Sequence, residues 1–233
     1  MTDPVMQSFG DRIWIADAAP VSVAGFHYPT RMVVIRLADG GVMAVSPVAL
    51  TSKLRDAVAA LGPVRHLIAP NALHHLFLGD WAEAFPEAKV HAAPGLRAKR
   101  KDIRFDADLG DAPDPDWAGD LEQVVVRGNL ITEEVVFFHA PSRTVLFTDL
   151  LQQFPRGWHA GWRGVVARLD LMVGAEPAVP RKFRAGFVNR RAARQAVARI
   201  LTWPADNVLL AHGAPVMSNG QAFLTGAFRW LMR

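Results

Sequence analysis

Residues 145–151 read Val-Leu-Phe-Thr-Asp-Leu-Leu, a stretch that places one carboxylate, that of Asp149, directly after an apolar run. The β-branched and aromatic residues predict a buried strand at 144–147. A carboxylate between hydrophobic neighbours is costly unless it is hydrogen-bonded, paired with a cation or bound to a metal. Asp149 is therefore a candidate metal ligand and catalytic residue; its alternative role is the cap of a following helix.

Two further stretches place polar side chains after a buried strand. Residues 209–215 read Leu-Leu-Ala-His-Gly-Ala-Pro, with His212 at the end of a predicted strand, and residues 70–75 read Pro-Asn-Ala-Leu-His-His, with His74 and His75 after another. Loops that follow adjacent strands converge at one edge of an α/β sheet, so we expect these side chains to meet. Taken singly, the histidine pair can be explained by a hydrogen-bonded core histidine, and His212 by a structural turn.

The elements along the chain form two similar halves. The first half predicts strands at 12–16, 32–37 and 42–45, a helix at 51–61, a strand at 66–69, a helix at 78–85 and a strand at 88–92. The second predicts strands at 121–126, 134–138 and 144–147, a helical region to about 173, a helix at 190–201, a strand at 208–211 and a helix at 218–232. A meander followed by β/α crossovers in each half predicts a single α/β domain over 1–233, an αββα four-layer sandwich.

The composition limits the classes of protein that fit. With 51% hydrophobic and 21% charged residues the chain reads as a folded globular protein. It has no cysteine, which excludes disulfides, thiolate metal sites and a cysteine nucleophile. No signal peptide and no apolar run of about 20 residues is visible, so we expect a cytoplasmic protein without a membrane partner.

The charge balance carries little information about partners. The net charge is +4 and the basic runs at 97–101 and 190–199 fit solvated helix faces, so nucleic acid is not expected as a partner. The aromatic, glycine-rich segment 157–162 is a candidate lid or substrate wall, or a loop packed on the core. The sequence does not indicate an oligomeric state.

From about Phe9 to Arg233 these motifs, in order and spacing, resemble the metallo-β-lactamase superfamily. Residues 145–151 are similar to the superfamily strand whose Asp bridges two metals, and residues 210–215 to the late motif whose His is a ligand. Residues 70–75 lie where the superfamily has its His-x-His-x-Asp-His motif. The Pro-Asn-x-x-His-His pattern is typical of a branch known only as a domain of unknown function.

The departures from the superfamily pattern predict a reduced metal site. With His75 as the last His of the motif, its two leading His positions fall on Pro70 and Ala72 and its Asp position on His74. Ser46 replaces the Asp of an early strand end, and Asn129 stands near the position of a middle His. The remaining candidate ligands are His74, His75, Asp149 and His212, with Asn129 as a substitute.

Two functions remain open. The resemblance implies a hydrolase of a small ester, lactone or thioester that uses one divalent metal ion, zinc in the first place, with Asp149 orienting the attacking water. The alternative is a non-catalytic binding or scaffold protein that kept the fold and binds no metal, because fold does not fix function. A nucleic-acid-directed function ranks last, since relatives of that kind keep the full histidine motif.

Overall fold

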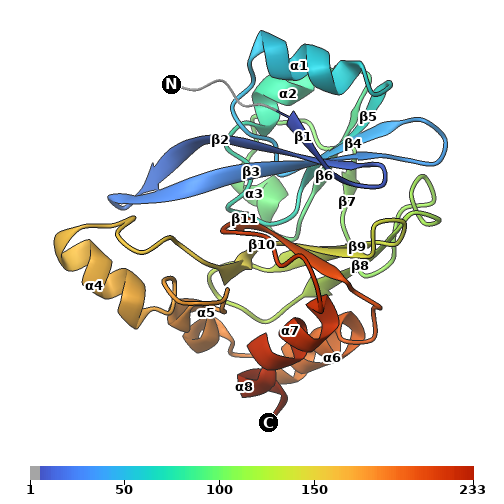
Figure 1. Ribbon diagram of the computed structural model, residues 1–233. Helices are drawn as coiled ribbons and strands as arrows, with labels where there is room; N and C mark the ends of the chain where they lie inside the picture. Colours follow the sequence, from blue (N-terminus) through green and yellow to red (C-terminus); the bar gives the residue numbers. More distant parts are fainter. Residues whose placement is uncertain (1–5) are drawn as a thin grey trace.

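Two β-sheets face each other in the computed structural model, which describes residues 6–233 (Figure 1). The first sheet has the order β1 (Met6–Gly10), β2 (Ile13–Val23), β3 (Phe26–Arg36), β4 (Val42–Val45), β5 (Val64–Ala69), β6 (Lys89–Ala92) and β7 (Ala107–Asp108). The second has the order β11 (Asn207–His212), β10 (Thr144–Gln152), β9 (Glu134–His139) and β8 (Leu121–Val126). Strands β4 to β7 are parallel, as are β10 and β11, and the other neighbours are antiparallel.

Helices cover the outer face of each sheet. The first sheet carries α1 (Ser52–Ala59), α2 (Leu78–Ala84) and α3 (Leu96–Lys99), and the second carries α6 (Arg190–Ile200), α7 (Gly220–Ala227) and α8 (Arg229–Met232). Two further helices follow β10: α4 (Gly161–Leu169) lies below the tip of the β2–β3 hairpin (Figure 1), and α5 (Arg181–Gly186) packs through Phe183 on the core of the second sheet. The predicted αββα four-layer sandwich is confirmed.

The strand sequences explain why the layers form. In β3, Val33 and Ile35 pack between the sheets, while Met32 and Val34 pack under the helices of the first sheet. Successive side chains of a strand point to opposite faces, so an unbroken apolar run is needed where both faces are covered. The strands that carry the site therefore end inside the protein, and polar side chains at their ends are shielded from water.

The structure corrects the boundaries of four predicted elements. Strands β2 and β3 are 11 residues each and form a hairpin that extends well beyond the predicted 12–16 and 32–37. The sequence of its outer half did not indicate a strand, because residues 17–20 of β2 are small or polar and include Pro20. Strand β10 continues past Phe147 to Gln152, and the predicted C-terminal helix is divided at Phe228 into α7 and α8. Within residues 6–233, no helix is both long enough and apolar enough to cross a bilayer.

A buried histidine pair predicts acid sensitivity. His66 and His91 stand on neighbouring strands with their Nδ1 and Nε2 atoms 3.1 Å apart, and burial lowers the pKa of His91 to about 4. The unfolded chain, with a His pKa of about 6.5, takes up this proton more readily. The contribution of neutral, buried His91 to the free energy of unfolding is therefore fully present above about pH 6.5. It is lost as the pH falls toward 4, with a loss of about 2 kcal/mol at pH 5 for one such group.

Urea unfolding at about pH 7 and pH 5 measures this effect. The stability lost between the two pH values is smaller in His91→Gln than in the wild type. His27→Gln, at an exposed position, is the control and keeps the wild-type difference. An equal loss in His91→Gln and in the wild type would contradict the assignment.

Candidate functional site

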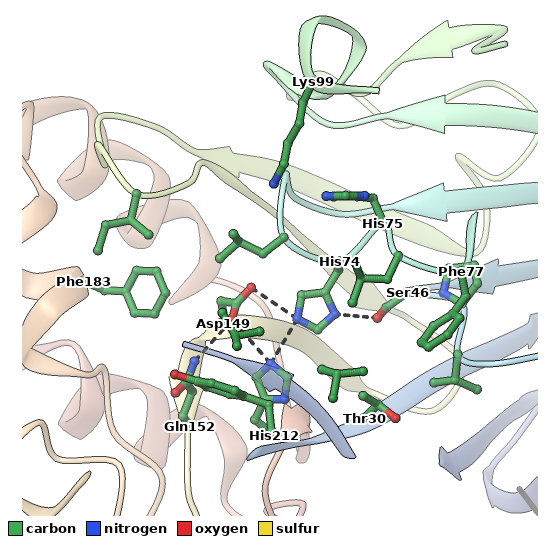
Figure 2. A pocket seen from close by; sticks show the side chains of 18 of the residues that line it. Thr30, Ser46, His74, His75, Phe77, Lys99, Asp149, Gln152, Phe183 and His212 are labelled. Atoms are coloured by element: carbon green, nitrogen blue, oxygen red, sulfur yellow. Dashed lines mark hydrogen bonds and ion pairs between the residues drawn. The ribbon is translucent and has the colours of Figure 1, made fainter. Parts of the chain in front are cut away.

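Three side chains from both sheets meet at one edge of the sandwich (Figure 2). Asp149 lies on β10, His212 ends β11, and His74 lies in the loop after β5. His74 Nε2 is 3.2 Å from Asp149 Oδ2, His212 Nε2 is 3.4 Å from Asp149 Oδ1, and the two Nε2 atoms are 3.1 Å apart. All three side chains are withdrawn from solvent. The predicted convergence of these strand ends is thus observed.

The separation of these atoms fits a single metal ion. Ligand atoms about 2.0–2.1 Å from a tetrahedral zinc ion are about 3.3–3.4 Å from one another. The two imidazole Nε2 atoms, 3.1 Å apart, are close to that separation, and each lies 3.2–3.4 Å from a different oxygen of Asp149. In the part of the chain that the structure describes, this is the one group of three or more His, Cys, Asp or Glu side chains whose possible ligand atoms all lie within 4.8 Å of one another.

Both imidazoles are oriented by their other ring nitrogen. His212 Nδ1 donates to the carbonyl oxygen of Pro29 at 2.6 Å, which fixes the ring and turns Nε2 toward Asp149. His74 Nδ1 lies 2.6 Å from Ser46 Oγ. Ser46 is buried and has a φ of +56°, a backbone conformation that serine rarely adopts. The residue that replaces the superfamily Asp therefore holds a histidine in place.

The electrostatics of the cluster favour a cation between these groups. Burial alone raises the pKa of Asp149, but His74 and His212 outweigh it and hold the pKa well below its usual range. Burial lowers the pKa of His74, and the charge of Asp149, its hydrogen bond and the charge of Glu134 together raise it above the usual value. Asp149 is thus an anion that a proton on His74, or a metal ion, can neutralise.

A fully buried carboxylate on β9 sets the path of β10 at the site. Glu134 accepts the backbone N–H groups of Thr148, Asp149 and Leu150 at 2.8, 2.7 and 3.0 Å. The pairing of β10 with β11 is interrupted between Phe147 and Gln152, over the same residues. Burial, and then the charge of Asp149, raises the pKa of Glu134. In the sequence Glu134 is the first residue of a predicted strand, and no local pattern indicates this role.

Asn71 is a second contributor that the sequence analysis did not single out. Its Nδ2 donates to Asp149 Oδ2 at 2.8 Å and to Thr148 Oγ1 at 2.9 Å. Its Oδ1 accepts the backbone N–H groups of Leu73 and His74, so the amide fixes the loop and the carboxylate together. An Asn that bonds the backbone two and three residues on is typical of an Asx turn, and its place between a strand and the histidine pair was the available signal.

Two predicted ligands lie outside the cluster. His75 Nδ1 is 2.9 Å from Arg100 Nη1, and burial, with Lys99 and Arg100 nearby, lowers the pKa of His75 to about 4. Figure 2 shows its ring beside Lys99, turned away from Asp149. Asn129 donates to the carbonyl oxygen of Phe183 at 2.8 Å and accepts the N–H of Ile131 at 3.0 Å. Both ends of its amide thus hold a loop.

The cluster opens into a cavity of about 390 Å³. Aliphatic and aromatic side chains supply most of its wall, namely Val21, Val23, Tyr28, Pro47, Val48, Leu73, Leu76, Phe77, Ile131 and Phe183. Lys99 and Lys182 are the charged residues of the wall outside the histidines and Asp149. A mainly apolar cavity with a few polar groups at one point is typical of a small-molecule site.

The two-sheet sandwich and its strand-end cluster define a protein of the metallo-β-lactamase fold. The chain belongs to the family described as a domain of unknown function, DUF4336, which matches residues 10–170. A search of the curated proteins finds no match.

Solved structures agree on the fold over the full chain. The metallo-β-lactamase from Pontibacter korlensis is 14% identical, with 99% of this chain and 100% of that chain covered and a TM-score of 0.66. The metallo-β-lactamase DIM-1 is 12% identical, with 98% of each chain covered and a TM-score of 0.67. The Flv1 flavodiiron core from Synechocystis sp. PCC6803 is 11% identical, with 99% of this chain and 61% of that chain covered and a TM-score of 0.65.

Replacement of the buried carboxylate predicts a loss of stability. Glu134→Gln leaves one side-chain oxygen to accept three N–H groups and turns an amide N–H₂ toward the backbone donors. We expect the free energy of unfolding to fall by about 2 kcal/mol, measured by urea unfolding at neutral pH. Glu87→Gln, at an exposed position, is the matched control. A Glu134→Gln variant as stable as the wild type would show that these hydrogen bonds do not hold β10.

Proposed function

We propose that this protein is a hydrolase that depends on one divalent metal ion, zinc in the first place, and cleaves a small ester, lactone or thioester. The observation that carries the proposal is the buried set of His74, Asp149 and His212, with donor atoms 3.1–3.4 Å apart at the base of an apolar cavity. An ion with three protein ligands polarises a carbonyl group and lowers the pKa of water at its open position.

The hydrogen bonds of Asp149 favour one ion over two. Its Oδ2 accepts Asn71 Nδ2 at 2.8 Å, and its Oδ1 accepts Gln152 Nε2 at 3.3 Å. An oxygen that already accepts an N–H has less capacity to bridge to a second ion. The amide of Asn71 also places partial positive charge beside the two carboxylates of Asp149 and Glu134.

The side chains of the site have distinct tasks in this proposal. Asp149 stays ionised and orients the attacking water by accepting a hydrogen bond from it, because His74 and His212 lower its pKa. Ser46 and the carbonyl of Pro29 keep the imidazoles turned toward the carboxylate. The aliphatic wall binds the apolar part of the substrate and excludes water around the reacting carbonyl.

A second function is favoured by one feature of the same cluster. His74 Nε2 lies within hydrogen-bond distance of both His212 Nε2 and Asp149 Oδ2, so a single proton on His74 can satisfy the cluster without an ion. In that case the protein is a non-catalytic binding or scaffold protein, and the cavity holds a ligand that is not turned over.

Metal content distinguishes the two functions. Protein purified without a histidine tag and dialysed in separate samples against zinc, manganese or iron, then against metal-free buffer, is expected to retain near one equivalent of metal, zinc in the first place, by elemental analysis. His74→Ala and His212→Ala remove one ligand each and are expected to lose the metal. His75→Ala is the matched control and keeps it, because His75 faces Arg100. No retained zinc, manganese or iron in the wild type would exclude the hydrolase and leave the binding protein.

The apolar wall predicts the preference among substrates. For aryl esters, kcat/KM is expected to rise by about tenfold from an acetyl to a hexanoyl group, because each buried methylene contributes about 0.8 kcal/mol when fully buried and less in an open cavity. Leu76→Ala, in the cavity wall, reduces that ratio, and Met217→Ala, outside it, does not. An equal kcat/KM for both esters would contradict the assigned role of the wall.

A further inference from the structure

Helix α4 carries an apolar stripe that faces solvent. Trp162, Val165, Val166 and Leu169 follow the spacing of one helix face and are between 41% and 61% exposed. Ala167, which is fully buried, lies on the opposite side and packs with Phe154 and Met172. A helix on a protein surface normally exposes its polar residues and buries its apolar ones, whereas α4 exposes its apolar side chains. A contiguous exposed apolar face of this kind marks a contact surface.

Positive charge borders the stripe on both sides. Successive helix residues are rotated by about 100°, which places Arg163 on one flank and Arg168 on the other. Arg163 also stacks over the ring of Trp162, at 4.7 Å from its centroid. Helix α4 contains no acidic residue, and Asp170, which follows it, is paired with Lys182. Exposed Arg156 adds a further positive charge just before the helix.

The stripe is joined to the mouth of the cavity by the β2–β3 hairpin. Phe26, at the tip of the hairpin, packs edge-on against Trp162 with ring centroids 5.8 Å apart. Val23, on the other arm of the tip, lines the cavity and is 55% exposed. Figure 1 shows the hairpin tip directly over α4. Leu76 and Ile131 are further exposed apolar residues of the cavity wall, so apolar surface continues from α4 to the cavity.

We propose that α4 and the tip of the β2–β3 hairpin bind the surface of an anionic lipid bilayer, with α4 lying in the plane of the interface. An apolar face flanked by arginines, with Trp among the apolar residues, is the composition that such helices use. The expectation of no membrane partner rested on the absence of a segment that could cross a bilayer. A helix that lies in the plane of the interface does not need such a segment. Docking in this way turns the mouth of the cavity toward the lipid.

A second copy of the chain is a poorer occupant of the same face. Two α4 helices packed stripe to stripe would bring Arg163 and Arg168 of each copy close to the same residues of the other. Helix α4 has no carboxylate to pair with them, so the contact gathers like charges at a desolvated surface. The phosphate groups of an anionic bilayer supply the opposite charge.

Co-sedimentation with vesicles tests the proposal. The wild type is expected to bind vesicles of phosphatidylcholine mixed with phosphatidylglycerol and to bind vesicles of phosphatidylcholine alone at least about tenfold more weakly. Val165→Ser/Leu169→Ser, which keeps the Trp162–Phe26 contact, is expected to weaken binding to the mixed vesicles by about tenfold. Arg156→Gln/Arg168→Gln is expected to remove the preference for the anionic lipid. Met217→Ser, an exposed apolar residue elsewhere, is the matched control.

Three results would overturn the proposal. One is a wild type that does not bind the mixed vesicles, and another is a Val165→Ser/Leu169→Ser variant that binds them as well as the wild type does. The third is a wild-type dimer in sedimentation velocity that the same variant converts to a monomer, without vesicle binding, which would assign the face to a second copy. Equal thermal unfolding midpoints for all variants exclude misfolding as the cause of any loss. None of these measurements depends on a hydrolase activity.

Discussion

The carboxylate of Glu134 is the element on which the arrangement of the site depends. It lies between two sheets, fully buried, where an ion without partners would be prohibitively costly. Three consecutive N–H groups of β10 supply its partners, and in doing so they leave the ladder with β11. The strand is displaced over Thr148, Asp149 and Leu150, and Asp149 is presented to the two histidines. If β10 stayed paired with β11 over these three residues, Asp149 would therefore no longer face His74 and His212.

The sequence predicted the architecture, and it singled out the three residues that the structure brings together, for identifiable physical reasons. Apolar runs of strand length can be read without tertiary information, and a polar residue at the end of such a run marks the sheet edge where loops converge. The choice between His74 and His75 could not be made, because it depends on which of two successive side chains turns inward after the loop. The hydrogen bonds of Asn71 to Leu73 and His74 settle it, and they exist only in the folded loop.

Other features escaped prediction because their signals are not local. Glu134 reads as a polar residue at the start of a strand, and its role depends on β10, which is ten residues further along the chain. The outer half of the β2–β3 hairpin has no apolar run of strand length, and its residues are ordered by pairing with each other. Two buried carboxylates, Glu134 and Asp149, lie beside the amide of Asn71 and the imidazoles of His74 and His212. A proton on His74 or a metal ion could balance the charge of Asp149.

The contact that orients His212 has a consequence for any attempt to map the site by substitution. The acceptor of its Nδ1–H is the carbonyl oxygen of Pro29, a main-chain atom that every amino acid at position 29 would supply. Alanine scanning or comparison of side chains would pass over this position, although it fixes the orientation of the imidazole. The orientation of His212 depends on the course of the β3 backbone and not on the side chain at position 29. Insertions and deletions in the hairpin are therefore the changes that would alter it.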